Sequence, residues 1–533
     1  MAAPASDYVQ ANIDPSLKPA LAALCAARPK EPVKWLGEYL LANKPSGPTQ
    51  PPPLVPTEGL PSAASIIAQI HGGSKTCVEV VSEKLARLDQ VEPTLNAFVE
   101  VMREAALTSA RAVDAKIAKG LPLRRLEGLP IVVKTNIDLS GTLTTAATPA
   151  LAEWRPRLNA PCVEPLLAEG AIVLGKTTMP EMAIGFRGQS ALHGQTMNPF
   201  NVEHIPGGSS TGTAVAIAAG IVPCGLGSDT AGSLRVPAAH CGGVGLRPSI
   251  GPDRVWSATG VVPCSVMRDT PGPMGGCVSD VALLDAVVRG EPAVALPASL
   301  LGVRIGIAED WIAEAPPLAP ETRKGIDLAA AALASAGATV GAVAGLAEVK
   351  QLASATWEPP LPVPIEDSGA ALQAYLDRHA SNLPDNLKTV ADVAEKFGNG
   401  SPIAGILKHY YALEPKGLSQ EGFDAKMVAR EEGIAATEAA YAAFFARTGL
   451  SVVLMPVYPA EPTRCDAPPI NTFTNEGAFA PHLCTIGNAP QLVLPTPSKF
   501  AASGIPTSVM LLGVDDKIVL SIGLALEQAL KEM

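Results

Sequence analysis

The chain has 533 residues, 47% apolar and 17% charged, which is typical of a globular protein with a large core. Its 40 basic and 51 acidic residues give a net charge of −11, which argues against nucleic acid or an anionic membrane surface as the main partner. The nine cysteines form no C-x-x-C pair and the seven histidines no H-x-x-x-H pair, so we expect no disulfide scaffold, no metal site and no cofactor.

Residues 10–45 predict a small helical hairpin. Its first helix carries leucines at helical spacing, namely Leu17, Leu21 and Leu24. After the turn "ARPKEP", a second helix carries an apolar stripe made of Val33, Leu36 and Leu40. Two helices of this length cannot enclose a core by themselves, so their apolar faces need a partner.

The segment "ARPKEPVKWLGEYLLANKP" resembles the Dumpy-thirty dimerisation and docking motif, which reads "ERP-x-x-P" and then "FLA-x-YLL-x-N". The resemblance implies a homodimer formed through the hairpin, which receives an amphipathic helix of a scaffold protein. Such motifs occur in ciliary and chromatin assemblies, so the resemblance also implies association with a cilium or axoneme, while the scattered cysteines indicate a reducing compartment and hence a cytoplasmic protein. The alternative is an ordinary hairpin packed on the rest of its own chain.

A proline-rich linker is predicted at residues 46–61, followed by an α/β domain over residues 62–533. The stretch 65–101 is predicted to be helical, and "LEGLPIVVKTNID" to carry a short strand. Residues 300–445 are Ala-rich and predicted to be mainly helical, like a cap. Within them, the uncharged stretch from Leu328 breaks at "SAGA", which indicates helix, turn and strand rather than a membrane span.

The stretch "GAIVLGKT" matches the phosphate-binding pattern G-x-x-x-x-G-K-[ST], with Lys176 as its lysine. Its four spacer residues are apolar and partly β-branched, so they favour a buried strand where the pattern needs a loop of free N–H groups. We therefore predict a turn at Gly170, a core strand and a second turn at Gly175, and no nucleotide site.

Two serine clusters lie in residues 205–249, where small residues crowd and let backbone approach backbone. "GSSTG" fits the G-x-S-x-G nucleophile elbow with Ser210 at its centre, but "NVEHIPG" before it is not the strand that an elbow requires. A serine nucleophile needs a base, and the chain contains no S-x-x-K. Lys134 lies at the end of an apolar strand, where desolvation lowers the pKa of an ammonium group.

Three blocks resemble the amidase signature family of serine hydrolases: "GLPIVVKTNID", "GKTTMPEMAIG" and "PGGSSTGTA…GLGSDTAGSLRVPAAHCGGVGLRPS". The similarity runs from about residue 62 to the C-terminus. It implies the amidase signature fold, a central mixed β-sheet flanked by helices. It also assigns Lys176 to the family's "GKT-N/T-MPE" segment, which helps to wall the active site.

The resemblance also implies a Ser–cis-Ser–Lys triad. Ser233 would be the nucleophile, Ser209 the residue that relays its proton, and Lys134 the base. The implied oxyanion hole is formed by the backbone N–H groups of Thr230, Ala231, Gly232 and Ser233. Asp229 and Arg235 would brace this loop as a charge pair.

The sequence departs from the family pattern at two positions. Thr211 replaces the usual glycine after the double serine, and Ala231 replaces the first glycine of "GGS". Alanine tolerates positive φ poorly, so we expect a slightly altered oxyanion loop.

The block "GVVPCSVMRDTPGPM" resembles the indoleacetamide and mandelamide hydrolase branch of the family. This implies a small primary amide of the aryl-acetamide type, with ammonia as the leaving group. The "DTAGS…RVPAA" arrangement is also similar to allophanate hydrolases, which keeps urea-type amides open. Two other functions remain, an aminotransfer subunit like the glutamyl-tRNA amidotransferases and an anchored structural subunit of a scaffold complex.

Overall fold

In the computed structural model the chain divides into two units, residues 1–57 and residues 58–533. The structure describes residues 53–56, 59–251, 255–313, 317–356, 367–397, 407, 411, 420–467 and 488–533. The predicted hairpin at residues 10–45 and most of the predicted linker lie outside the described residues. All the helices and strands described lie in the second unit.

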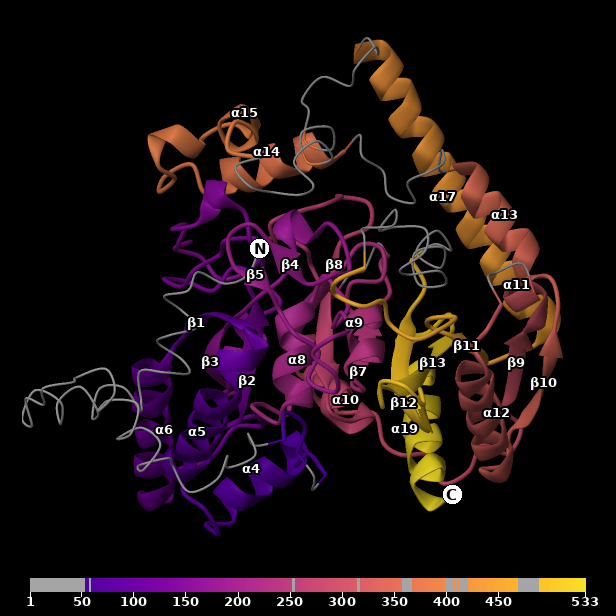
Figure 1. Ribbon diagram of the computed structural model, residues 1–533, viewed down its shortest axis with the longest axis horizontal. Coiled ribbons are helices and arrows are strands. Elements are labelled where there is room, and N and C mark those ends of the chain that lie inside the picture. Colours follow the sequence, from indigo (N-terminus) through magenta and orange to yellow (C-terminus); the bar gives the residue numbers. More distant parts are fainter. Residues whose placement is uncertain are drawn as a thin grey trace, which may run out of the picture. The chain divides into compact units, whose positions relative to one another are not determined.

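Among the described residues, an 11-stranded sheet forms the centre of this unit, in the order β1-β3-β2-β6-β8-β7-β12-β13-β11-β9-β10 (Figure 1). The pairs β3–β2, β2–β6, β11–β9 and β9–β10 are parallel and the other neighbours antiparallel, so the sheet is mixed. The strands are β1 (Phe98–Val101), β2 (Pro130–Lys134), β3 (Ile172–Thr177), β6 (Cys224–Asp229), β7 (Val244–Arg247), β8 (Thr270–Gly275), β9 (Arg304–Ala308), β10 (Thr339–Val343), β11 (Val452–Pro456), β12 (Gln491–Lys499) and β13 (Pro506–Leu512). A separate two-stranded sheet pairs β4 (Gln189–Ser190) with β5 (Gly194–Gln195).

Helices flank the sheet, which confirms the predicted α/β class with a central mixed sheet (Figure 1). They are α4 (Ala63–His71), α5 (Cys77–Leu95), α6 (Arg103–Ala118), α7 (Glu164–Ala168), α8 (Thr211–Ala218), α9 (Arg235–His240), α10 (Val278–Arg289), α11 (Glu309–Ala313), α12 (Pro320–Ser335), α13 (Leu346–Thr356), α14 (Ser368–Arg378), α15 (Val390–Ala394), α17 (Gln420–Thr448) and α19 (Asp516–Glu532). Among the described residues, none of the helices combines the length and apolar character needed to cross a membrane.

The predicted turn at Gly175 is wrong, because β3 runs through Gly175 and Lys176 to Thr177. Gly175 has a different reason to be glycine. A Cβ at this position would lie 2.4 Å from the carbonyl oxygen of Glu100 in the neighbouring strand β1. The glycine therefore lets β1 approach β3 closely, and the pattern G-x-x-x-x-G-K-T lies mostly on a strand.

Residues 65–101 and the stretch from Leu328 are both predicted to contain helix. The stretch 65–101, predicted to be helical, is divided into α4 and α5 by a turn at residues 72–76, and after Leu95 its last part forms the edge strand β1 instead. Asn96 adopts the left-handed conformation, with φ 50°, and so ends α5. The stretch from Leu328 is helix, turn and strand as predicted, with α12 ending at Ser335 and β10 beginning at Thr339.

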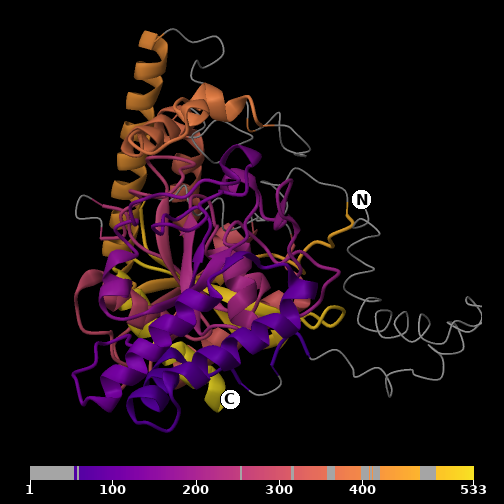
Figure 2. The same cartoon turned by 90° about the vertical axis from the view of Figure 1, so that its left-hand side faces the viewer.

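Helices α14 and α15 lie beyond one end of the strands in both views (Figures 1 and 2). They share an apolar cluster with the loops after β2, β3 and β6. The cluster includes Leu372 and Tyr375 from α14, Trp154 from the loop after β2, and Ala231 from the loop after β6. Burial of these side chains against one another fastens the two helices to the sheet end that carries the predicted site.

Candidate active site

Lys134 is the last residue of β2, and its side chain is fully buried. Its Nζ lies 2.7 Å from Ser209 Oγ, 2.9 Å from Ser228 Oγ and 3.2 Å from Ser210 Oγ. Burial lowers the pKa of Lys134 to about 7, against the opposing effect of the Asp229 and Asp269 carboxylates. In a large fraction of the molecules, Lys134 therefore carries a neutral amine at neutral pH, and hydroxyl groups surround that amine.

Ser209 and Ser210 lie directly before α8, which begins at Thr211. The Gly208–Ser209 peptide bond is cis. The hydroxyl of Ser210 donates to the carbonyl oxygen of Ser228 at 3.0 Å and accepts from the Ser228 N–H at 3.1 Å. This hydroxyl is thus fully engaged and buried, and no strand of the described residues runs directly into it, which argues against the nucleophile elbow.

Ser233 lies in the tight loop that joins β6 to α9 and is 4% exposed. Its carbonyl oxygen accepts a hydrogen bond from the Ser210 N–H at 3.0 Å, which joins the two serine loops. Its own hydroxyl makes no hydrogen bond with the residues that the structure describes. The structure thus brings Lys134 and Ser209 into contact and places Ser233 on the adjoining loop with its hydroxyl uncommitted.

The N–H groups of this loop differ in what they contact. The Gly232 N–H donates to Asp229 Oδ1 at 2.8 Å, so it is already bonded and unavailable to the oxyanion hole to which the sequence assigned it. Those of Thr230, Ala231 and Ser233 have no acceptor within the described part of the chain. The left-handed backbone conformation falls on Gly232, with φ 116°, and not on Ala231. The replacement of glycine by Ala231 is therefore free of the backbone strain that the sequence led us to expect.

Asp229 braces the loop together with two buried arginines. Arg235 Nε lies 2.9 Å from Asp229 Oδ2, as predicted for a charge pair, and Arg247 Nη1 lies 3.1 Å from Oδ1. Burial alone would raise the pKa of the Asp229 carboxyl, but the two guanidinium charges outweigh it and hold the pKa well below its usual range. The carboxylate stays ionised and fixes the start of α9.

Sequence reasoning missed several polar residues around these groups. Ser228 holds Lys134, and Asn136 Nδ2 donates to the same Ser228 hydroxyl at 3.0 Å. Asp269 Oδ1 accepts from the Thr230 hydroxyl, while its Oδ2 accepts from two backbone N–H groups of the 264–269 loop. The pairing of Arg247 could have been predicted from the sequence, since a charged residue at the end of an apolar strand needs an ionic partner when it is buried.

A cavity of about 410 Å³ lies beside the 264–269 loop, and Lys134, Ser209 and Ser233 are not among its lining residues. Asp269, which contacts Thr230, is one of its lining residues, and the others come from residues 257–269 and from α14. They are Ser257, Ala258, Thr259, Gly260, Val261, Pro263, Ser265, Val266, Ala371, Ala374, Tyr375 and Arg378. Its volume lies within the range of ligand pockets, about 300–1,000 Å³.

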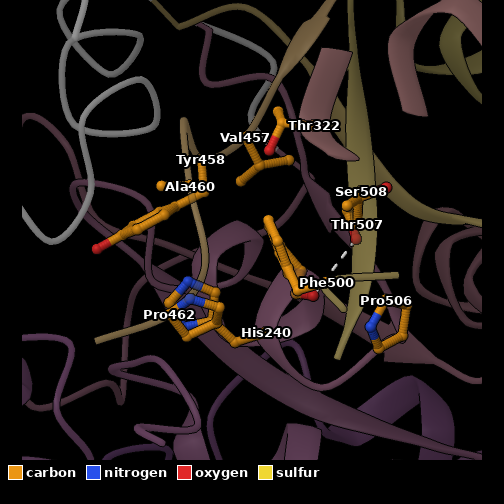
Figure 3. A pocket seen from close by; sticks show the side chains of 11 residues that line it. His240, Thr322, Val457, Tyr458, Ala460, Pro462, Phe500, Pro506, Thr507 and Ser508 are labelled. Carbon is orange, nitrogen blue, oxygen red and sulfur yellow. Dashed lines mark hydrogen bonds between the residues drawn. The ribbon is translucent and has the colours of Figure 1, made fainter. Parts of the chain in front are cut away.

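A second cavity, at the end of α9, has a volume of only about 10 Å³ (Figure 3). His240 and Tyr458 line it, with ring centroids 4.7 Å apart. Burial, with a smaller contribution from His204, lowers the pKa of His240 to about 3 and keeps its ring neutral. This space suits a single water rather than a substrate. Within the described ranges, no three His, Cys, Asp or Glu side chains are grouped to hold a metal.

A family model described as Amidase matches residues 79–517, and one described as Dpy-30 motif matches residues 4–45. These matches confirm both family resemblances. Among curated proteins, the chain is similar to a glutamyl-tRNA(Gln) amidotransferase subunit of Synechococcus sp. (strain CC9605), with 36% identity over 284 residues. It is 38% identical over 277 residues to the corresponding subunit of Chloroflexus aurantiacus. These matches cover 51% and 49% of the chain, and span 57% and 56% of the relatives' length.

Solved structures extend the similarity over most of the chain. The peptide amidase of Stenotrophomonas maltophilia is 26% identical, with a TM-score of 0.69. The aligned region covers 88% of this chain and 97% of that one. A bacterial aryl acylamidase of the amidase signature family shares the fold, at 23% identity and a TM-score of 0.68, over 88% of this chain and 96% of that one.

Proposed function

The chain belongs to the Amidase family, and from this premise we propose that it is a serine amidase that hydrolyses a carbon–nitrogen amide bond to a carboxylate and ammonia. The main support for this proposal is the 2.7 Å contact between Lys134 Nζ and Ser209 Oγ. The contact lies at a buried site, where the pKa of the lysine falls to about 7. A neutral amine beside a hydroxyl is a base that can pull a proton through that hydroxyl.

In the proposed mechanism, Ser233 Oγ attacks the amide carbon while its proton passes through Ser209 to Lys134. The N–H groups of Thr230, Ala231 and Ser233 stabilise the oxyanion of the tetrahedral intermediate, and Gly232 shapes the loop. As the C–N bond breaks, Lys134 returns the proton through Ser209 to the leaving ammonia. Water then attacks the acyl-enzyme by the same route, which releases the carboxylate and restores Ser233.

We propose a small primary amide as the substrate, of the aryl-acetamide type. The block "GVVPCS", on which this rests, supplies Val261, Pro263 and Ser265 to the lining of the 410 Å³ cavity. A urea-type amide is the alternative, but it is smaller and would leave most of this cavity unfilled. Ammonia release from phenylacetamide and from allophanate, measured side by side, distinguishes the two.

The similarity to the amidotransferase subunits favours a second candidate function, in which the ammonia is passed to a partner rather than released. Such a protein would act as one subunit of an assembly and depend on a partner that receives the ammonia. An isolated protein that a fluorophosphonate probe labels but that releases no ammonia from any simple amide would favour this function over the first.

Labelling with a fluorophosphonate probe tests the proposed nucleophile. The wild-type protein and the Ser210→Ala variant should be labelled, whereas Ser233→Ala should be neither labelled nor active. Labelling that persists in Ser233→Ala and disappears in Ser210→Ala would overturn the assignment and revive the elbow interpretation.

The Dpy-30 motif indicates a role in docking or dimerisation, and we propose that residues 10–45 form a homodimer that binds an amphipathic helix of a scaffold protein. Burial of each leucine of the two stripes would contribute roughly 1.5–3 kcal/mol, and a second copy supplies the needed surface. Sedimentation should give a dimer that becomes monomeric when residues 1–60 are deleted, or when Leu36 and Leu40 are changed to Asp. A dimer that survives both changes would refute this role. An anchored structural role, and a cytoplasmic location at a cilium or axoneme, remain predictions.

A further inference from the structure

Helix α14 forms one wall of the 410 Å³ cavity, to which it contributes Ala371, Ala374, Tyr375 and Arg378. Its N-terminal end is tied to the opposite wall. Ser265 Oγ donates to Asp367 Oδ2 at 2.9 Å, and the Ser368 hydroxyl donates to the carbonyl oxygen of Cys264. The two walls of the cavity are thus joined directly at one end.

The C-terminal end of α14 is held by a second, fully buried cluster centred on Asp138. Tyr375 donates its hydroxyl proton to Asp138 Oδ1 at 2.8 Å, and His379 Nε2 lies 2.8 Å from Asp138 Oδ2. Trp154 Nε1 donates to the same Tyr375 oxygen at 2.9 Å. The Asp138 and His379 side chains are wholly inaccessible to solvent, so water cannot replace these bonds.

Asp138 also lies close to the proposed base along the chain. The N–H of Ile137 donates to the carbonyl oxygen of Lys134 at 3.0 Å, and the Asp138 N–H donates to that of Gly260 in the cavity wall at 2.8 Å. The same short segment carries Asn136, which holds the Ser228 hydroxyl beside Lys134. The short backbone segment 134–138 therefore joins the cluster at the end of α14 to the neighbourhood of the base.

We propose that the cavity binds the acyl group of the substrate, and that Tyr375 and His379 are positioning residues that hold α14 as its wall through Asp138. This inference rests on the proposed amidase function and names its substrate class as amides with an apolar acyl group the size of a six-membered ring. Most lining residues are apolar, and the two alanines of α14 leave the space open.

Substrate selectivity tests the wall. The ratio of kcat/KM for phenylacetamide to that for acetamide should fall about tenfold in Ala374→Phe, because the added ring fills the cavity. Ala105→Phe, at an exposed alanine of α6, is the matched control and should leave the ratio unchanged. An unchanged ratio in Ala374→Phe, with both amides hydrolysed by the wild type, would overturn the inference and leave the amidase function standing.

Tyr375→Phe tests the positioning role, since it removes the hydroxyl but keeps the ring. KM for phenylacetamide should rise about tenfold, with a smaller change in kcat. Tyr441→Phe is the control, because Tyr441 is also buried and donates only to the backbone oxygen of Gly513. Equal effects of the two variants on KM would overturn the positioning role.

Binding of phenylacetamide to the Ser233→Ala protein, measured by calorimetry, provides a test without turnover. Binding that Ala374→Phe weakens about tenfold in this background supports the pocket even if the proposed nucleophile is wrong. Binding that is absent, or that Ala374→Phe leaves unchanged, contradicts the pocket. Failure of the amidase function itself would appear instead as a wild-type protein that releases no ammonia from any amide tested, whereas ammonia release that persists in Ser233→Ala would show only that another residue is the nucleophile.

Discussion

Lys134 and Lys176 lie on neighbouring strands, with Val133 of β2 opposite Lys176 of β3 and Lys134 opposite Thr177. Adjacent residues along a strand point to opposite faces of the sheet, so the two side chains enter different surroundings. Both are fully buried, and burial lowers the pKa of each to about 7. By burial and pKa alone, the two lysines cannot be distinguished.

Their hydrogen-bond partners differ. Lys134 Nζ contacts the hydroxyls of Ser209, Ser210 and Ser228, and a hydroxyl can accept one proton while it donates another. Lys176 Nζ donates to the carbonyl oxygen of Ile137 and lies 3.3 Å from Thr144 Oγ1. The nearest partner of Lys176 is thus a carbonyl oxygen, which has no proton to pass on, and Thr144 supplies a single, more distant hydroxyl. The nearest partner of Lys134 is instead the Ser209 hydroxyl at 2.7 Å. A lowered pKa therefore marks a buried amine, and the neighbouring hydroxyls are what make Lys134 the candidate base.

The largest expected effect is the difference in kcat between the variants in which one or the other lysine is replaced by methionine. Lys134→Met should lower kcat about 10²–10⁴-fold, the usual contribution of a general base. Lys176→Met keeps every hydroxyl around Lys134 and should lower kcat far less. Ammonia release, measured at equal amounts of folded protein, checks this. A larger loss of kcat in Lys176→Met would reverse the assignment of the two residues.

The pH dependence of kcat should also differ between the two methionine variants. The proposed mechanism needs neutral Lys134, whose pKa is about 7, so kcat should fall about tenfold per pH unit below this value and level off above it. Lys176→Met should keep this acidic limb, and Lys134→Met should lose it. A profile of kcat against pH for the three proteins is sufficient. An acidic limb that survives in Lys134→Met would show that another group is the base.

The two lysines should contribute equally to the pH dependence of the free energy of unfolding. Between about pH 7 and the usual lysine pKa of 10.5, the unfolded chain binds a proton at each lysine that the folded protein does not bind. The free energy of unfolding should therefore rise with pH in this window, by up to about 1.4 kcal/mol per pH unit for each lysine. Each methionine variant should lose its own share of this slope. Denaturant titrations at about pH 8 and about pH 9 measure it, and an unaltered slope in either variant would refute the lowered pKa of that lysine.

The sequence predicted the parts of this structure that local patterns or motif blocks encode. The apolar run before Lys134 is β2, and the motif blocks located Ser209 beside Lys134. Strand β12 was missed because Pro495 and Pro497 lie within it, and proline normally argues against a strand. The Asp138–His379 contact joins residues 241 positions apart, so no local pattern could have indicated it.

The smallest effect should come from nucleotide. A phosphate cradle needs loop N–H groups that converge on an anion and a lysine that is free to reach it. Here the Ile172 N–H donates to the carbonyl oxygen of Leu129 at 2.8 Å, and the pattern continues as β3. Lys176 is buried and directed at the Ile137 carbonyl oxygen rather than at solvent. ATP with magnesium should therefore leave the thermal unfolding midpoint of the wild-type protein and of Lys176→Met unchanged. A nucleotide-dependent rise in the wild type that disappears in Lys176→Met would make Lys176 a phosphate ligand and remove the contrast between the two lysines.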